Sequence, residues 1–290
     1  MKLIKPNFEI ITQNPNNDGM LKHIELCGRV CYKSEDKIKD NTAVIFVNGL
    51  IKSGHTSVLE HGTVYLYTKM YSRVVERYER NKYSKVIINP RSKILEDCYI
   101  TTNYRVLVEN NWLDDLQYQC EPTEFHEKRI TVKFICDRGI SHEFVRHRVF
   151  SFSQESTRYC NYSKDKFTNE ITFIYPAWCN TIKESTKEER AKVYGDKEVN
   201  GWYASDNLEN QWVISMLDAE ITYISLIDAG WKPEQARSVL PNSLKTELMM
   251  TGFVTDWKHF FELRCSKAAH PQAQELAIPL EEEFKKLNLI

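Results

Sequence analysis

The sequence predicts a protein of the α+β class, in which short strands are flanked by helices. Short segments alternate apolar and polar residues, as half-buried strands do, and residues 129–136 are the clearest of them. Longer segments repeat their apolar residues with the helical period, and residues 207–229 form the longest. The two kinds of segment are interspersed, and no internal repeat or low-complexity linker separates them.

Composition indicates an ordinary globular chain. Its 290 residues, 42% apolar and 27% charged, are enough for one large domain or two small ones. A formal net charge of −1 argues against bulk electrostatic attraction to nucleic acid or to an anionic membrane. Any site for an anionic ligand must therefore be local.

The eight cysteines point to a reducing environment. They include no Cys-x-x-Cys pair, and the start of the chain lacks the apolar core of a secretory signal. We therefore expect reduced, mostly buried thiols in a cytoplasmic protein. No stretch is both long and uncharged enough to predict a membrane span, so we expect a soluble protein.

Caps and apolar stripes predict the elements of the first half. Asp18 and Asn41 are suited to cap helices, and Gly54 is suited to end the second one. We expect strands at 8–12, 63–68 and 99–102, and helices at 18–32, 42–52, 104–109 and 112–118.

The stretch 70–128 looks inserted. Its first part, 70–98, is strongly charged and spaces apolar residues from Tyr71 to Tyr78 as an amphipathic helix does. A basic helix of this kind can contact nucleic acid, but alternating charge signs favour a solvated helix.

The second half predicts a similar mixture of elements. The longest helix ends at Gly230, Pro233 begins the next, and Asp256 is suited to cap another. We expect strands at 129–136, 171–174 and 248–254, and helices at 140–149, in part of 181–197, at 207–229, from 233, from 256 and from 272.

One helical face raises the question of a metal. His23, Cys27 and Cys31 recur at intervals of four residues and therefore share a face. No fourth ligand lies at a familiar zinc spacing, so we interpret them as core residues and expect no metal.

The stretch 146–159 concentrates chemically active side chains. It contains Arg146, His147, Arg148 and Arg158 together with hydroxyls and a carboxamide. Arginine binds phosphate or carboxylate through two parallel bonds, so the stretch favours an anionic, planar ligand such as a nucleotide. Solvated surface is the alternative for an arginine-rich stretch taken alone.

A second polar stretch, 54–61, reads Gly-His-Thr-Ser-Val-Leu-Glu-His. A loop rich in titratable groups between a helix and a strand is suited to form part of a site. The alternative is a helix cap followed by a buried Glu60–His61 pair, and spacing alone leaves both open.

Taken together, these pieces resemble the flavin-dependent thymidylate synthases. The family signature of Arg-His-Arg, two variable residues, Ser, and later Ser-x-Arg-Tyr is matched between Arg146 and Tyr159. The 54–61 loop resembles the Gly-His-x-Ser/Thr-x-x-Glu-His loop of that family. Residues 236–242, Leu263-Arg264 and the early segment 29–34 match in order, so the resemblance runs from about 29 to 276 outside the inserted stretch.

The resemblance implies reductive methylation of dUMP to dTMP. Methylenetetrahydrofolate would supply the carbon, and NADPH would supply electrons through FAD. It also implies a homotetramer with sites shared across subunits, and a single α+β domain over 1–290 with a small mixed sheet, flanking helices and an insertion at about 70–128.

It further implies roles for particular residues. Arg264 would be catalytic, stabilising charge that develops on the pyrimidine ring. Ser156 would bind rather than act as a nucleophile, and none of the eight cysteines lies at a matched catalytic position. The positions matched to dUMP are Glu143, Arg146, Gln154, Ser156, Arg158, Arg237 and Arg264. The positions matched to FAD are His55, Ser57, Arg146, His147, Arg148, Gln154 and His259.

The chain departs from the family pattern at the flavin site. Ser153-Gln154 replaces the common Asn-Glu pair, although Gln is also a family variant. Phe253 and Thr255 stand where members commonly have the Asn and Arg of Thr-Gly-Asn-x-Arg. The inserted stretch contains that missing pattern at Asn103 and Arg105, which leads to the hypothesis that it supplies the lost FAD contacts.

Two other classes of function stay open. One is an RNA- or nucleotide-binding module that stacks bases on Phe150, Phe152 and Tyr159. The other is a family member that binds dUMP without FAD, which the changes at Phe253 and Thr255 would explain.

Overall fold

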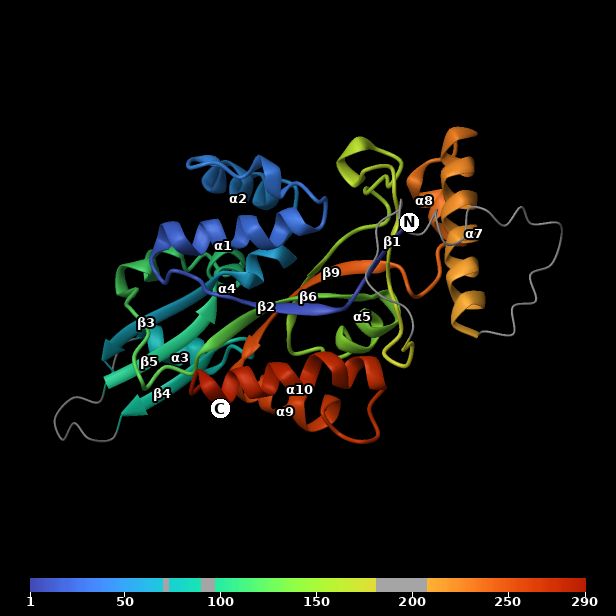
Figure 1. The fold of residues 1–290 in the computed structure, drawn as a ribbon. Helices are drawn as coiled ribbons and strands as arrows, with labels where there is room; N and C mark the ends of the chain where they lie inside the picture. The colour runs from blue at the N-terminus through green and yellow to red at the C-terminus, as the bar shows by residue number, and fades with distance from the viewer. Residues whose placement is uncertain (70–72, 90–96, 181–207) are drawn as a thin grey trace, which may run out of the picture.

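An antiparallel sheet of four strands forms the centre of the described chain, which comprises residues 1–69, 73–89, 97–180 and 208–290 of this computed structural model (Figure 1). The strand order is β2 (Asn7–Ile11), β6 (Arg129–Asp137), β9 (Lys245–Phe253) and β7 (Ser151–Gln154). Strands β6 and β9 pair along their whole lengths, from Arg129 opposite Phe253 to Asp137 opposite Lys245. Opposed residues share a face, so the alternation of each strand is continued by its neighbour.

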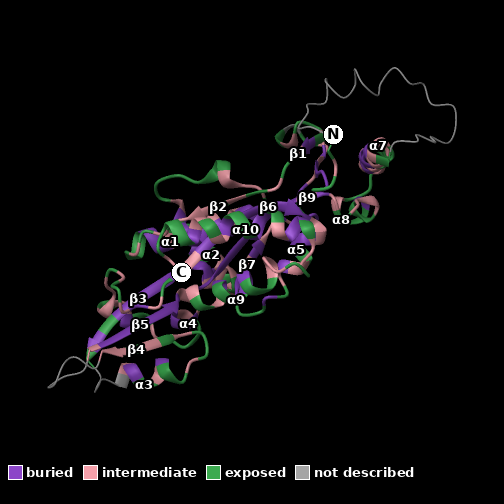
Figure 2. Ribbon diagram, turned by 60° about the horizontal axis from the view of Figure 1, so that its bottom comes forward, coloured by how far each residue is buried: buried purple, intermediate pink, exposed green. Residues whose placement is uncertain are grey.

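One face of this sheet is apolar. Its residues include Val132, Phe134, Leu248 and Met250, all fully buried. They pack against helices α5 (Arg138–Phe144), α9 (Val254–Arg264) and α10 (Pro271–Lys286). Figure 2 shows the sheet strands largely buried and the outer helix faces exposed. Burial of these side chains supplies the main apolar stabilisation of the central unit.

The opposite face is polar and is covered by α1 (Asn17–Val30). The Thr131 hydroxyl lies 2.9 Å from His23 Nε2 and 2.7 Å from the Thr251 hydroxyl. His61 continues this chain, with Nδ1 2.7 Å from Thr251 Oγ1 and Nε2 3.0 Å from Ser153 Oγ. Each of these buried polar groups thus has a partner, as a dry interface requires.

A second antiparallel sheet has the order β3 (Thr63–Lys69), β5 (Asp97–Asn103) and β4 (Lys85–Asn89). Apolar side chains of β3 and β5 share a core with α1 and α2 (Thr42–Lys52). The remaining elements of this unit are the helices α3 (Arg73–Glu79) and α4 (Tyr104–Glu109) and the 3₁₀ helices η2 (Thr56–His61) and η3 (Leu113–Tyr118).

A third cluster lies at the other end of the central sheet. Strands β1 (Lys2–Ile4) and β8 (Thr172–Ile174) pair in parallel beside α7 (Leu208–Asp228) and α8 (Pro233–Ala236) (Figure 1). Short 3₁₀ helices complete the described chain: η1 (Glu35–Lys37), η4 (Asp165–Phe167) and η5 (Arg237–Val239). None of the described helices combines the length and the apolar composition that a membrane span needs.

Small sheets with flanking helices are as predicted, but within the described residues there are three sheets rather than one mixed sheet. The amphipathic helix predicted from the stripe between Tyr71 and Tyr78 is confirmed in its described part by α3. The rest of the charged stretch contains β4, which pairs with β5 and was not predicted. Strand β1 was not predicted. Tyr71, the helical part of 181–197 and the start of the 207–229 helix lie outside the described residues.

Three predicted helix boundaries were also wrong. Helix α9 begins at Val254, so Asp256 is its third residue rather than its cap. Asn16, not Asp18, caps α1, because its side chain accepts a 2.7 Å hydrogen bond from the Gly19 amide. Gly19 permits this turn, since a Cβ there would lie 2.4 Å from Asn14. Helix α5 ends at Phe144 rather than near residue 149, because the following residues turn into β7 and pair with β9.

The buried histidines predict a loss of stability in mild acid. Burial lowers the pKa of His61 to about 3, so between pH 6.5 and that value the unfolded chain binds a proton that the folded chain does not. Stability therefore falls as pH falls through this window, by up to about 1.4 kcal/mol per pH unit for each such histidine. In urea unfolding between pH 6.5 and 5, we expect the free energy of unfolding of His61→Gln to depend less on pH than that of the wild type. His55→Gln, at an exposed position, is the control. An unchanged pH dependence in His61→Gln would contradict the assignment.

Candidate active site

Arg264, the last residue of α9, is held on three sides by residues of the 138–147 segment. Its Nη1 donates to Glu143 Oε2 at 2.7 Å, and Nη2 donates to the Glu143 carbonyl at 2.8 Å. Its Nε donates to His147 Nε2 at 3.0 Å. The structure therefore brings the predicted catalytic arginine against two residues that are more than a hundred positions away in sequence.

The contact with Arg264 requires a neutral His147. Burial, reinforced by the positive charge of Arg264, lowers the pKa of His147 to about 4. A neutral imidazole that accepts at Nε2 carries its proton on Nδ1. The Phe260 ring lies 5.0 Å from the imidazole and helps to keep it dry, while the His259 ring lies 6.4 Å away. The arginine is thus held in a fixed orientation.

Between Arg146 and Gln154 the chain turns and enters β7. Arg146 and Arg148 are exposed at the turn, and Phe150 is buried against Trp257 with ring centroids 4.8 Å apart. Gly252 makes this packing possible, because a Cβ on it would lie 2.3 Å from the Phe150 ring. Gln154 ends the strand, and its amide donates to Ser141 Oγ at 2.8 Å and Thr246 Oγ1 at 3.2 Å.

The Ser156–Tyr159 end of the motif meets two other parts of the chain. Arg237 Nη1 donates to Thr157 Oγ1 at 3.1 Å, which places this arginine beside the motif. The Ser156 amide donates to the Cys31 carbonyl at 3.0 Å, and the rings of Tyr32 and Tyr159 lie 4.8 Å apart. The separate sequence matches at 29–34, 156–159 and 237 therefore belong to one place in the fold.

Arg158 reaches the surface of this place. Its guanidinium lies 5.3 Å from the Tyr159 ring centroid and 3.9 Å from the Glu234 carboxylate. Both groups are exposed, so this ion pair contributes little stability. The side chain is accessible to an incoming anion.

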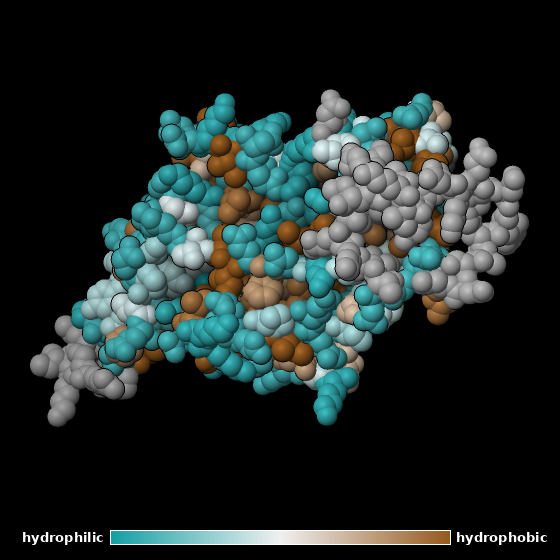
Figure 3. All heavy atoms as spheres, in the orientation of Figure 1, coloured by the Kyte–Doolittle hydropathy of each residue, from teal (hydrophilic) through white to brown (hydrophobic). Residues whose placement is uncertain are grey.

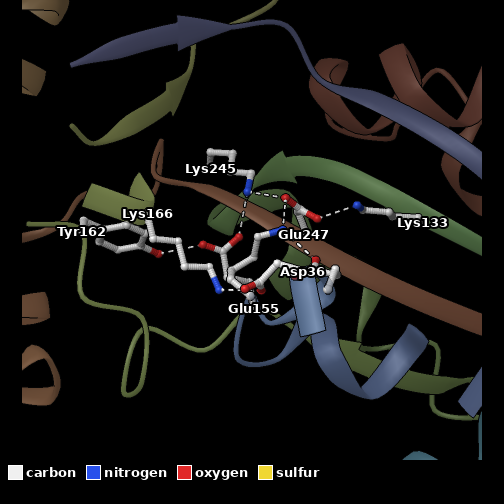
Figure 4. Close-up of polar contacts among 9 residues, drawn as sticks. Asp36, Lys133, Glu155, Tyr162, Lys166, Lys245 and Glu247 are labelled. Atoms are coloured by element: carbon white, nitrogen blue, oxygen red, sulfur yellow. Dashed lines mark hydrogen bonds and ion pairs between the residues drawn. The ribbon is translucent and has the colours of Figure 1, made fainter. Parts of the chain in front are cut away.

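A buried network of ion pairs includes Glu155, the residue before Ser156, and the sequence did not predict this network. Lys245 Nζ donates to Glu155 Oε2 at 2.8 Å and to Glu247 Oε1 at 2.6 Å. Lys33 and Lys133 also contact Glu247, at 2.8 and 2.6 Å. Figure 4 shows Lys245 pointing between the two carboxylates, with Lys133 on the far side of Glu247. The sequence did hold one signal: Lys245 and Glu247 lie two residues apart, so in a strand their charged side chains share one face.

The network keeps its members charged. Burial alone would raise the pKa of Glu247, but Lys245 and Lys33 hold it well below its usual range. Burial alone would lower the pKa of Lys245, and Glu155 and Glu247 more than reverse this effect. Tyr162 adds a hydroxyl that donates to Glu155 Oε1 at 3.1 Å. Glu155 is thereby fixed one residue before Ser156.

The other predicted residues lie near this centre but at the surface. His55 and Ser57 are exposed at the start of η2, which packs against β7 and α1. His259 is exposed on α9, with Nδ1 3.3 Å from a Glu262 carboxylate oxygen. The alternative Glu60–His61 pair is not formed, because Glu60 instead accepts from Arg105 Nη1 at 2.5 Å.

His23 and Cys27 of α1 face the protein interior. His23 Nε2 contacts Thr131, and Cys27 packs with Val30 and Met249. Cys31 is half-buried, and its backbone carbonyl accepts from Ser156. The structure thus gives His23 and Cys27 packing and hydrogen-bond roles within the core.

Two cavities adjoin these residues. One of about 300 Å³ includes Glu143 and is lined by Asp137, Trp178, Trp212 and His270. The other, of about 490 Å³, includes Arg148 and Phe150 and is lined by Arg129 and Phe253 on the sheet side. Each pairs aromatic surface with charged groups, which suits planar ligands that carry charge.

Comparison with known proteins now defines the class. The chain matches the Thy1 family model, described as thymidylate synthase complementing protein, over residues 10–86 and 89–288. This match covers far more than half of the chain, so the protein belongs to the Thy1 family.

Curated relatives agree with this match. A flavin-dependent thymidylate synthase of Pyrococcus furiosus is 30% identical over 151 residues, 52% of each chain. One of Geobacter sulfurreducens is 30% identical over 143 residues, 49% of this chain and 50% of its own. One of Corynebacterium aurimucosum is 24% identical over 259 residues, 88% of this chain and 72% of its own. The chain thus spans about half the length of the first two relatives.

The buried network predicts a large effect of removing its central cation. We expect Lys245→Met to lower the free energy of unfolding by about 3 kcal/mol, because Glu155 would be left buried without a cation. The double variant Lys245→Met/Glu155→Leu should recover most of this loss in chemical denaturation. Lys166→Ala, which removes an exposed contact to Asp36, is the control and should change stability by less than about 0.5 kcal/mol. A double variant no more stable than Lys245→Met would contradict this prediction.

Proposed function

We propose that this protein catalyses the reductive methylation of dUMP to dTMP. The carbon comes from methylenetetrahydrofolate, and electrons come from NADPH through bound FAD. The observation that carries the proposal is Arg264, a cation fixed by Glu143 and a neutral His147 close to the arginine-rich motif. The proposal is also supported by relatives that are named flavin-dependent thymidylate synthases.

Arg264 acts on the pyrimidine ring of the substrate. Its oriented guanidinium stabilises negative charge that develops on the N3/O2 edge when carbon 5 becomes nucleophilic. A fixed donor is more effective than a mobile one, because no reorganisation is needed during the reaction. Glu143 binds both arginine and substrate, and Gln154 and Arg146 complete the binding of the nucleoside.

The Ser156 end of the motif holds the phosphate of dUMP. Arg237 and Arg158 supply charge on either side of Thr157, and Ser156 supplies a hydroxyl. Arginine is suited to this task because its fork of donors fits phosphate oxygens. The buried network behind Glu155 keeps this end of the site in place.

FAD binds beside Arg146, His147 and Arg148, with His55, Ser57, Gln154 and His259 around it. The cavity of about 490 Å³ fits such a group, because Arg129 presents there a buried guanidinium whose Nε has no hydrogen-bond partner among the described residues. When bound, the flavin supplies the hydride chemistry. The protein contributes position, charge and the exclusion of water.

We also propose a homotetramer with sites shared between subunits. Support comes from apolar side chains that reach the surface, notably Val44 at 51% and Ile45 at 74% exposure on α2. Figure 3 shows apolar spheres over this helix and further apolar spheres down the middle of the same face. Adjacent exposed apolar residues commonly mark contact surfaces between chains.

The absorption spectrum of the purified protein tests the cofactor. With FAD added and the excess removed, we expect the flavin bands near the wavelengths of free FAD to remain with the protein, and NADPH to bleach them. A protein without a flavin site, treated in the same way, is the control for incomplete removal of free FAD. Protein that retains dUMP but no flavin would instead favour the dUMP-binding member without FAD.

Substitution of Arg264 tests the role in ring activation. Arg264→Ala should lower the rate of dTMP formation at least about a hundredfold, because one oriented electrostatic donor is lost. Bound-flavin absorbance should persist and the variant should remain folded, with a somewhat lower temperature of unfolding because the hydrogen bonds to Glu143 and His147 are lost. The matched control is Lys258→Ala, which removes an exposed cation from the same helix. Substantial turnover in Arg264→Ala would refute the assignment.

A further inference from the structure

The cavity of about 490 Å³ lies where the 70–128 segment meets the central sheet. That segment contributes Lys82, Tyr83, Lys85 and Asn103 to its wall. Arg129 and Phe253 form the wall on the sheet side, at the paired ends of β6 and β9. The Arg148–Ser151 part of the motif closes it.

Arg129 is a buried cation that has no ion-pair partner among the described residues. It is 9% exposed, and it donates to neutral acceptors: the Glu60 carbonyl at 2.9 Å and the hydroxyls of Thr63 and Ser151, each at 3.3 Å. Burial lowers its pKa to about 10, so it stays charged at neutral pH. Its Nε has no hydrogen-bond partner in the part of the chain that the structure describes. A buried charge of this kind favours a nearby anion, because the more distant charges of Glu60 and Asp256 offset its desolvation only in part.

The two carboxylates on the cavity wall are already engaged. Glu60 accepts from Arg105 at 2.5 Å, and Asp256 accepts from the Phe253 amide at 3.1 Å. Neither forms an ion pair with Arg129 among the described residues, although both carboxylates favour its charge from a greater distance. The cavity therefore retains an excess of positive charge from Lys82, Lys85, Arg129 and Arg148.

Phe253 arranges two of these cations. Lys85 Nζ lies 5.6 Å from the centroid of its ring, and the Arg129 guanidinium lies 5.5 Å from it. Cations at this distance from an aromatic face are attracted by its quadrupole. Phe253 cannot make the amide hydrogen bond of the Asn that stands there in the family pattern, but its ring holds a lysine and an arginine at the cavity.

We propose that Lys82, Lys85 and Arg129 bind the phosphate groups of the flavin dinucleotide. This inference rests on the proposed function and adds to it the residues of the 70–128 segment that complete the flavin site. It also revises the hypothesis about Asn103 and Arg105. Asn103 lines the cavity, with its side-chain oxygen capping α4, whereas Arg105 is bound to Glu60 and Glu109. The cationic role therefore falls to the two lysines and Arg129.

Flavin binding by the apoprotein tests this proposal without measuring turnover. The variant Lys82→Ala/Lys85→Ala is titrated with FAD, FMN and riboflavin, and flavin fluorescence reports binding. We expect about tenfold weaker FAD binding or more, and riboflavin binding within about twofold of wild type, because only phosphate contacts are lost. Arg80→Ala is the matched control, since it removes an exposed cation of the same segment that pairs with Glu76 outside the cavity.

The lysine pair is exposed, so its variant should fold. Arg129→Met adds a second measurement, with the same expected loss of FAD affinity, provided that its circular dichroism matches wild type. Unchanged FAD affinity in the lysine variant would overturn the proposal, as would an equal loss for riboflavin. Wild-type protein that binds no flavin would overturn the proposed function itself, and this inference with it.

Discussion

The polar face of the central sheet is the constraint on which the site depends. Every second residue of β6 and β9 lies on the face that α1 covers in part, and many of these residues are polar. Because this face is buried, its polar groups must find partners within the protein. Two arrangements along the face do so fully: the Thr131–Thr251–His61 chain in the middle and the Lys245–Glu247 network at one end. At the other end Arg129 does so only in part, since its Nη atoms have partners and its Nε has none among the described residues.

This order along the sheet also fixes the position of the 146–159 motif. Strand β7 pairs with β9, so the motif cannot shift along the sheet without breaking the hydrogen bonds of Ser153 and Gln154. One end of the motif is tied to Arg264 through His147. The other is tied to the network through Glu155. A ligand that contacts both ends therefore meets a preformed surface, which lowers the ordering cost of binding.

Local patterns were enough to predict most elements, but the partners of the site residues were not predictable. Helix α2 has the predicted bounds, 42–52, whereas β7 was missed because four residues of mixed polarity carry no decisive period, and only pairing with β9 makes them a strand. Glu143 forms an ion pair with Arg264, which lies more than a hundred positions away in sequence. Arg129 and Lys245 carry no motif at all, and their importance follows only from burial and from what surrounds them.

The close contact of Phe150 with Gly252 has an evolutionary consequence. The ring occupies the space that any side chain at position 252 would need, so the two positions act as one unit. Phe150 in turn packs on Trp257 and lies 6.2 Å from the His147 ring. A larger residue at position 252 could be accepted only after a smaller one had replaced the ring at position 150. The order in which these two positions can diverge is therefore restricted, and the restriction extends to the packing around His147.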